Sequence, residues 1–200
     1  MNSISGLYQL FSKLPKPYQL SVSQDYTSEM DELRSSVFPE SNHEGRNEDR
    51  YDNRAWHITI SHSGKLVAYC RIIPCPDAYF FNLTGSPLII NDTTSADWSR
   101  LVVVSTHRNR GLPVVIGFAS LLLAEALGKC YVYAATEPSR KTVGLIEALG
   151  YQAVGKPIAI ISTTVYSFDP QIFVCDLNHT TNAIHAKFIE ASKSLLLNYV

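Results

Sequence analysis

Hydrophobic residues recur three and four positions apart within residues 4–14 and again within residues 25–38. This spacing places side chains along one side of an α-helix, and a proline, which cannot continue a helix, follows each run at Pro15 and Pro39. The pattern therefore predicts two short helices. The polar stretch that comes next, residues 40–52, predicts a loop that is either disordered or a functional cover.

The rest of the chain changes between strand and helix patterns. Residues 55–61 and 66–73 flank the turn Ser63-Gly64, which predicts a β-hairpin. Further strands are predicted at residues 100–105, 131–136, 158–168 and 171–177, and helices at residues 112–127, 137–149 and 182–199. Because the helix at 112–127 is apolar on nearly every side, we expect it to be buried. This order predicts an α/β (α+β) fold with a mixed sheet and helices on both faces.

The size and charge of the chain limit its class. Its 200 residues and 22.3 kDa fit one domain over residues 1–200, with the N-terminal helices and cover loop in residues 1–52 and the core in residues 53–200. Hydrophobic residues make up 46%, enough to fill a core. The formal net charge of −1 argues against a nucleic-acid partner and against a protein that binds anionic membranes.

Cysteine and histidine spacing argues against a metal site or a disulfide framework. None of the four cysteines forms a CxxC pair, and the six histidines add no ligand spacing. No segment reads as a secretory signal, and the apolar run at residues 112–124 is too short to cross a membrane, which takes about 20 residues. We therefore expect a cytoplasmic protein with reduced cysteines, no metal and no membrane span.

A basic turn precedes the buried helix. It contains Arg108, Arg110 and Gly111, and it follows the strand predicted at residues 100–105. The N–H groups at a helix N-terminus and nearby guanidinium groups together bind phosphate or pyrophosphate. The turn therefore predicts a phosphate site, and a solvated basic turn is the alternative. Pro113 removes one N–H donor from this helix start.

Four short motifs follow one another in order along the chain. They are Arg34-x-x-Val37-Phe38, Asp49-x-Tyr51-Asp52, Val67-x-x-x-Arg71-x-x-Pro74 and Asp97-x-Ser99-Arg100. This series resembles the acyl-homoserine-lactone synthases, or autoinducer synthases, a branch of the GNAT superfamily of N-acyltransferases. The basic turn is similar to the pyrophosphate loop of that superfamily. The resemblance is closest between Arg34 and Arg100 and looser in the strands and helices that follow.

The resemblance implies both a fold and a reaction. The fold is a GNAT-like mixed central sheet with a V-shaped split between two parallel strands, here residues 100–105 and 131–136. The reaction is transfer of a fatty acyl group from acyl carrier protein or acyl-CoA to the amine of S-adenosylmethionine. The product is an N-acyl-homoserine lactone, a quorum-sensing signal. The acyl donor and S-adenosylmethionine are substrates, and no tightly bound cofactor is implied.

The resemblance also implies the site residues. Catalytic roles fall on Arg71, Asp97, Arg100, Asp49 and Asp52. Substrate-binding roles fall on Arg34, Phe38, Val103, Val104, Ala135 and Thr136. Contacts to the donor's phosphates fall on Arg108, Arg110 and Gly111. In the two strands that border the split, we expect the N–H of Val103 or Val104 to bind the oxyanion, and the small run Ala134–Thr136 to leave room for more than an acetyl group.

Three departures from the family pattern leave the acceptor open. Asp97, which is shorter by one methylene, stands where the family has a glutamate before Ser99-Arg100. Asn47 stands where the family has a glutamate, and no tryptophan occurs between Phe38 and Asp52. An N-acyl amino acid synthase, or another GNAT-type N-acyltransferase for a different small amine, is therefore the alternative. A non-catalytic protein that binds an acyl carrier is a third possibility. Tyr151 lies near the position of a tyrosine acid in many superfamily members, although autoinducer synthases do not need one.

Overall fold

The computed structural model describes residues 4–37, 51–74, 93–138, 141–155, 170–179 and 181–197. Two of the expected site residues, Phe38 and Asp49, lie outside the described residues. So does the strand expected at residues 158–168.

Seven strands form one mixed sheet. They are β1 (Tyr18–Ser23), β2 (Trp56–His62), β3 (Lys65–Pro74), β4 (Ser95–Val103), β5 (Tyr131–Thr136), β6 (Gln152–Val154) and β7 (Gln171–Asp176), in the order β1-β2-β3-β4-β5-β7-β6. Neighbouring strands are antiparallel except β4 and β5, which are parallel. The mixed α/β sheet is as predicted. Strands β1 and β6 were not predicted, and β4 begins five residues earlier than the strand predicted at residue 100.

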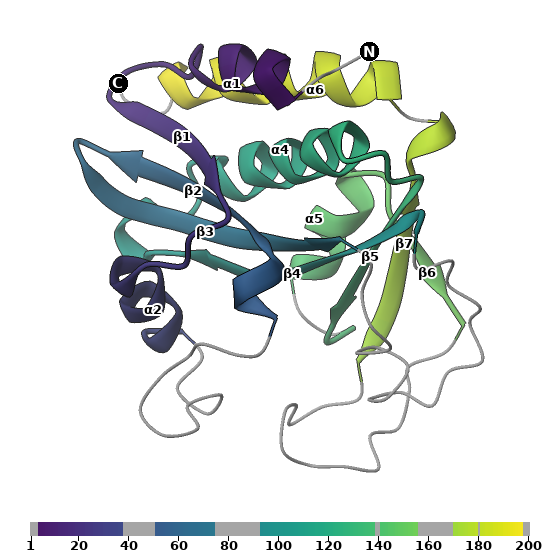
Figure 1. Cartoon of the computed structure of the whole chain (residues 1–200). Helices are drawn as coiled ribbons and strands as arrows, with labels where there is room; N and C mark the ends of the chain where they lie inside the picture. Colours follow the sequence, from purple (N-terminus) through teal and green to yellow (C-terminus); the bar gives the residue numbers. More distant parts are fainter. Residues whose placement is uncertain are drawn as a thin grey trace.

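Helices cover both faces of this sheet (Figure 1). They are α1 (Ile4–Phe11), α2 (Ser28–Ser35), α4 (Leu112–Ala126), α5 (Thr142–Ala148) and α6 (Thr181–Leu197), with short 3-10 turns η2 (Asp52–Arg54), η3 (Ser105–His107) and η4 (Leu177–His179). Helix α4 packs on β2, β3 and β4, and α1 and α6 pack on α4, whereas α2 packs against β3 and β4 on the opposite face. None of the described helices combines the length and the apolar character that a membrane crossing requires.

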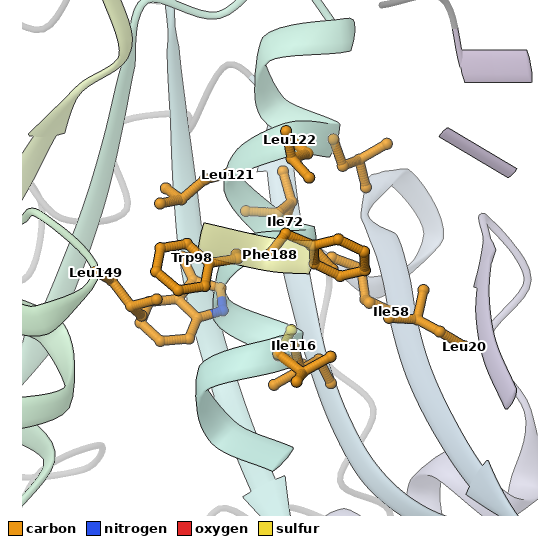
Figure 2. Close-up of a cluster of buried hydrophobic side chains, with 14 of the residues drawn as sticks. Leu20, Ile58, Ile72, Trp98, Ile116, Leu121, Leu122, Leu149 and Phe188 are labelled. Carbon is orange, nitrogen blue, oxygen red and sulfur yellow. The ribbon is translucent and has the colours of Figure 1, made fainter. Parts of the chain in front are cut away.

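The main core lies between the sheet and α4 (Figure 2). Eleven of the 15 residues of α4 are buried, because the sheet covers one side of this helix and α1 and α6 cover the other. Phe188 of α6 packs against Phe11 of α1, with ring centroids 5.4 Å apart. Cys70 of β3 faces α4, where its Sγ lies 3.1 Å from the Ser120 hydroxyl. The burial predicted for this helix is therefore confirmed.

Strands β4 and β5 pair at three positions and then separate. The ladder joins Ser95–Asp97 to Tyr131–Tyr133, and it stops there although both strands continue. On the other side of β4, Tyr69 pairs with Val102 but Arg71 pairs with Ser99, so β4 carries one extra residue. This β-bulge contains Arg100, which has a left-handed φ of 58°. A bulge bends the strand that carries it, and this one lies three residues after the last β4–β5 pair. The parallel pair that separates is the V-shaped split expected from the motifs.

The close approach of Leu149, the C-cap residue of α5, to Gly117 of α4 generates a stability prediction. A Cβ added at Gly117 in α4 would come within 2.5 Å of buried Leu149, whereas one added at Gly144 in α5 would meet no atom within 4 Å. Alanine favours a helix over glycine by about 1 kcal/mol. We expect Gly144→Ala to raise the free energy of unfolding by about 0.5–1 kcal/mol and Gly117→Ala to lower it by about 1 kcal/mol or more, since Leu149 must move.

Urea denaturation of the two variants beside the wild type measures this difference. Equal stabilisation by both substitutions would show that α5 does not pack against α4 in this way.

Candidate active site

The structure brings together three of the residues that the motifs single out, each from a different element. Arg34 of α2 places its Nη1 2.8 Å from both carboxylate oxygens of Asp52 in η2. Arg71 of β3 places its Nη1 2.7 Å from Oδ1 of the same carboxylate. All three residues have no exposed surface. Two guanidinium groups therefore share one buried carboxylate, and we call this group the Arg–Asp–Arg cluster.

The cluster is connected to β4 through a hydroxyl group. Arg71 donates from Nε to Oγ of Ser99, its register partner, at 3.0 Å. Asp97 stands two residues before Ser99, so its side chain lies on the same face of the sheet, and it has no exposed surface. The cluster thus lies on the α2 side of β4, beside the position where the split begins.

Aromatic rings surround the two guanidinium groups. The Arg34 guanidinium carbon lies 5.0 Å from the ring centroid of Tyr26 and 5.9 Å from that of Tyr69, and the Arg71 guanidinium carbon lies 5.9 Å from that of Tyr51. Burial opposes the charge of Arg34, but the Asp52 carboxylate outweighs it, and the pKa of Arg34 lies above its ordinary value. Arg34 therefore stays charged in a setting where cation–π contacts add to the ion pair.

A buried histidine supports the turn that carries Asp52, and the sequence analysis did not identify it. His57 of β2 lies 3.0 Å through Nε2 from the backbone oxygen of Asp52 and 2.9 Å through Nδ1 from the hydroxyl of Tyr69. A carbonyl oxygen only accepts, so Nε2 carries the proton and Nδ1 accepts from Tyr69. Burial, the main influence, lowers the pKa of His57. Its ring is therefore neutral and orients the Asp52 turn.

The backbone of β4 supplies N–H groups toward the split, with one correction to the sequence analysis. Val104 donates its N–H to the Val67 oxygen at 3.0 Å, so it is not available to an oxyanion. Successive N–H groups along a strand point to opposite sides. The N–H of Val103 therefore points away from β3 and toward the split. Leu101 lies two residues earlier on β4, within the bulge.

The expected donor-binding residues lie at the far end of β4. Gly111, with φ 79°, is the N-cap of α4, and Pro113 occupies the first turn. Arg108 donates from Nε to the Val103 oxygen at 3.4 Å, which directs its side chain back toward the end of β4. Across the split, Ala135 and Thr136 are half-buried on β5. The phosphate candidates and the Arg–Asp–Arg cluster therefore lie toward opposite ends of one strand. In the described residues, no group of three His, Cys, Asp or Glu side chains could hold a metal.

Solved structures share this architecture over most of the chain. The acyl-homoserine-lactone synthase LasI aligns with a TM-score of 0.65 and 15% identity, over 84% of this chain and 92% of LasI. BjaI, a CoA-dependent acyl-homoserine lactone synthase solved with SAM and isopentyl-CoA, aligns at 0.63 and 17%, over 84% and 90%. An acyl-CoA N-acyltransferase from Pseudomonas aeruginosa aligns at 0.55 and 20%, over 79% and 99%. No family model and no curated protein matches the sequence.

These likenesses establish the class of fold. The chain has the fold of the GNAT N-acyltransferases. Within that class its architecture resembles that of the acyl-homoserine-lactone synthases, the resemblance that the four motifs predict.

The buried histidine generates a pH prediction. Unfolded His57 takes up a proton as the pH falls through its ordinary pKa of 6.5, whereas folded His57 resists protonation until a lower pH. The free energy of unfolding therefore falls as the pH falls below 6.5. His57→Gln keeps an amide donor and a carbonyl acceptor but does not titrate, so we expect a shallower decline, by at most about 1.4 kcal/mol per pH unit.

Urea denaturation at a series of pH values from about 7 to about 5 measures the slope. His185→Gln, at an exposed histidine of α6, is the matched control and should keep the wild-type slope. The same slope in His57→Gln as in the wild type would contradict the neutral, buried imidazole.

Proposed function

We propose that this protein is an N-acyltransferase that moves a fatty acyl group from a phosphopantetheine thioester to the amine of S-adenosylmethionine. The observation that carries the proposal is the juxtaposition of two features, one on β4 and one beside it. One is the separation from β5 after Asp97, and the other is the Arg–Asp–Arg cluster on the adjoining face. The likeness to LasI and BjaI supports it, since BjaI was solved with SAM and isopentyl-CoA.

The donor end of the site uses the start of α4. Arg108, Arg110 and the N–H of Leu112, the first residue of α4, bind the phosphates of the donor, which is acyl carrier protein or a CoA thioester. The pantetheine arm then runs along β4 in the split. The thioester carbonyl faces the N–H groups of Leu101 and Val103, which stabilise the negative charge that develops on its oxygen. The backbone carries this role, so side-chain substitutions leave it in place.

The acceptor end uses the α2 face of β4. The guanidinium groups of Arg34 and Arg71 lie on this face, and planar guanidinium forks bind carboxylates such as the α-carboxylate of an amino acid. Ser99 and Asp52 hold the guanidinium fork of Arg71 in place, and we assign this fork to bind the substrate carboxylate. Arg100 follows Ser99 on β4, within the bulge. We assign Asp97 as the proton acceptor for the amine, because it lies on this face where the strands part.

The reaction has two steps. The neutral amine attacks the thioester carbon, a C–N bond forms, the C–S bond breaks, and the amine's proton passes through Asp97 to the departing thiolate. The carboxylate of the acylated S-adenosylmethionine then attacks the carbon next to the sulfonium. A C–O bond closes the lactone ring, and the C–S bond breaks with its electron pair left on sulfur. Methylthioadenosine leaves as a neutral thioether.

An N-acyl amino acid synthase is the second candidate. The guanidinium groups of the Arg–Asp–Arg cluster suit the α-carboxylate of any amino acid, and not only that of S-adenosylmethionine. Asn47 in place of the family's glutamate, and the missing tryptophan, alter the segment that precedes the cluster. Such an enzyme stops after the first step and releases an acyl amino acid.

Product analysis decides between these functions. The protein is incubated with acyl-CoA and acyl carrier protein thioesters of several chain lengths, together with S-adenosylmethionine or with amino acids, and the products are identified by mass spectrometry. We expect an N-acyl-homoserine lactone and an equal amount of methylthioadenosine. An acyl amino acid without methylthioadenosine would support the second candidate. Tight binding of an acyl donor without transfer to any amine would contradict both.

Arg71 supplies a test of the acceptor site that keeps the buried charge. Arg71→Lys retains a cation beside Asp52 but loses the planar fork, so it cannot hold Ser99, Asp52 and a substrate carboxylate together. A hydrogen bond to a charged group contributes roughly 1.5–3 kcal/mol, so we expect the KM for the amine substrate to rise about ten- to a hundredfold. The KM for the acyl donor should change little.

Arg54→Lys is the matched control. Arg54 is exposed and its guanidinium carbon lies 5.2 Å from the ring of Tyr51, a contact like that of Arg71. Steady-state kinetics with each substrate varied in turn measures both variants. An unchanged KM for the amine in Arg71→Lys would remove Arg71 from the acceptor site.

A further inference from the structure

The vertex of the split is closed by a large aromatic side chain. The last paired residues of β4 and β5 are Asp97 and Tyr133, so the next two positions, Trp98 and Ala134, face each other where the strands begin to part. Their side chains lie on the α4 side of the sheet, opposite to Asp97. Trp98 is 5% exposed and Ala134 is 2% exposed. The smallest side chain on one border of the split thus faces the largest on the other.

Trp98 packs against a second aromatic ring. Its indole stacks on the ring of Tyr151, which follows α5, with centroids 5.7 Å apart and planes inclined by 28°. Figure 2 shows the indole between Leu149 and Leu121 on the side of α4 and α5. Tyr151 is 3% exposed, and its buried hydroxyl has no hydrogen-bond partner among the described residues. Packing against these neighbours fixes the indole in place.

The small run Ala134–Thr136 does not stand alone at the split. Ala134 lies opposite Trp98 and belongs to the same buried cluster. Thr136 is engaged with Thr142 of α5, with their hydroxyl oxygens 3.1 Å apart. Small residues on β5 therefore do not by themselves leave room for a long acyl chain.

We propose that Trp98, backed by Tyr151, is the floor of the acyl site and restricts the donor to short acyl groups. This inference rests on the proposed acyl transfer. A thioester carbonyl at the N–H of Leu101 is three residues from Trp98, about 10 Å at ~3.3 Å per residue, and the bulge shortens that distance. A butanoyl chain directed toward the vertex ends before the indole. A decanoyl chain reaches it and must displace it.

Acyl-chain preference tests the proposal. The measurement is the ratio of kcat/KM for butanoyl to decanoyl donors, with the acyl group on CoA and on acyl carrier protein. We expect the wild type to favour butanoyl by about tenfold or more, because added methylenes in a closed apolar site are discriminated to this degree. Trp98→Ala should abolish or reverse the preference. Trp98→Phe, a smaller change that disturbs folding less, should give an intermediate ratio.

Phe188→Leu is the matched control. Phe188 is a buried aromatic residue of α6, on the far side of α4 from the sheet, so its substitution weakens the core without touching the split. The chain-length ratio of this variant should equal that of the wild type. A wild type that transfers decanoyl as well as butanoyl would overturn the proposal. So would a ratio in Trp98→Ala and Trp98→Phe that matches Phe188→Leu.

Direct binding separates this proposal from the proposed function. Calorimetry with S-butyl- and S-decyl-phosphopantetheine, which cannot react, reports the acyl site without turnover. Tighter binding of the butyl compound, lost in Trp98→Ala, supports the role of Trp98 in limiting chain length, even if no amine is acylated and the proposed function fails. Equal binding of both compounds, in a protein that does acylate an amine, overturns the role of Trp98 alone. Absence of binding by either compound overturns both.

Discussion

The charge of Asp52, buried between two arginines, is the interaction on which the rest of the structure depends. It joins α2, the η2 turn and β3, three segments that share no backbone ladder with one another. Removing such charges from water is costly, and the cost is offset only where geometry is good and the remaining polar atoms are satisfied. Ser99 and His57 supply that geometry here, one holding Arg71 and the other holding the turn of Asp52.

The sheet separates two kinds of chemistry. Its α4 face is apolar almost throughout, because α4 is enclosed between the strands and the pair α1 and α6. Its α2 face carries the Arg–Asp–Arg cluster and Asp97. Strand β4 separates from β5 after Asp97, and its bulge at Arg100 follows directly. The proposed acyl transfer needs two substrates held in a fixed relative position. The packed α4 face holds β4 in place, and the charged groups of the α2 face orient the acceptor.

Much of this could be predicted from the residues, and the failures have physical causes. Motif spacing identified Arg34, Asp52 and Arg71, and a helix apolar on every side indicated that α4 is buried. Strand β1 was missed because its alternation is short and its stability comes from pairing with β2. His57 was missed because the pairing of β2 with β3 decides which side chains face Asp52. The surroundings of Ala134 could not be predicted from its own segment, because Trp98, which lies opposite it, belongs to a different strand.

A crystal structure of the protein with S-butyl-CoA and S-adenosylmethionine is the most direct test of the account. We expect the CoA phosphates at the N-terminus of α4, the sulfur between β4 and β5, and the α-carboxylate of S-adenosylmethionine on the guanidinium fork of Arg71. The amine would then lie on the α2 face of β4, beside Asp97. Density for the donor outside the split, or an acceptor bound away from the Arg–Asp–Arg cluster, would contradict it.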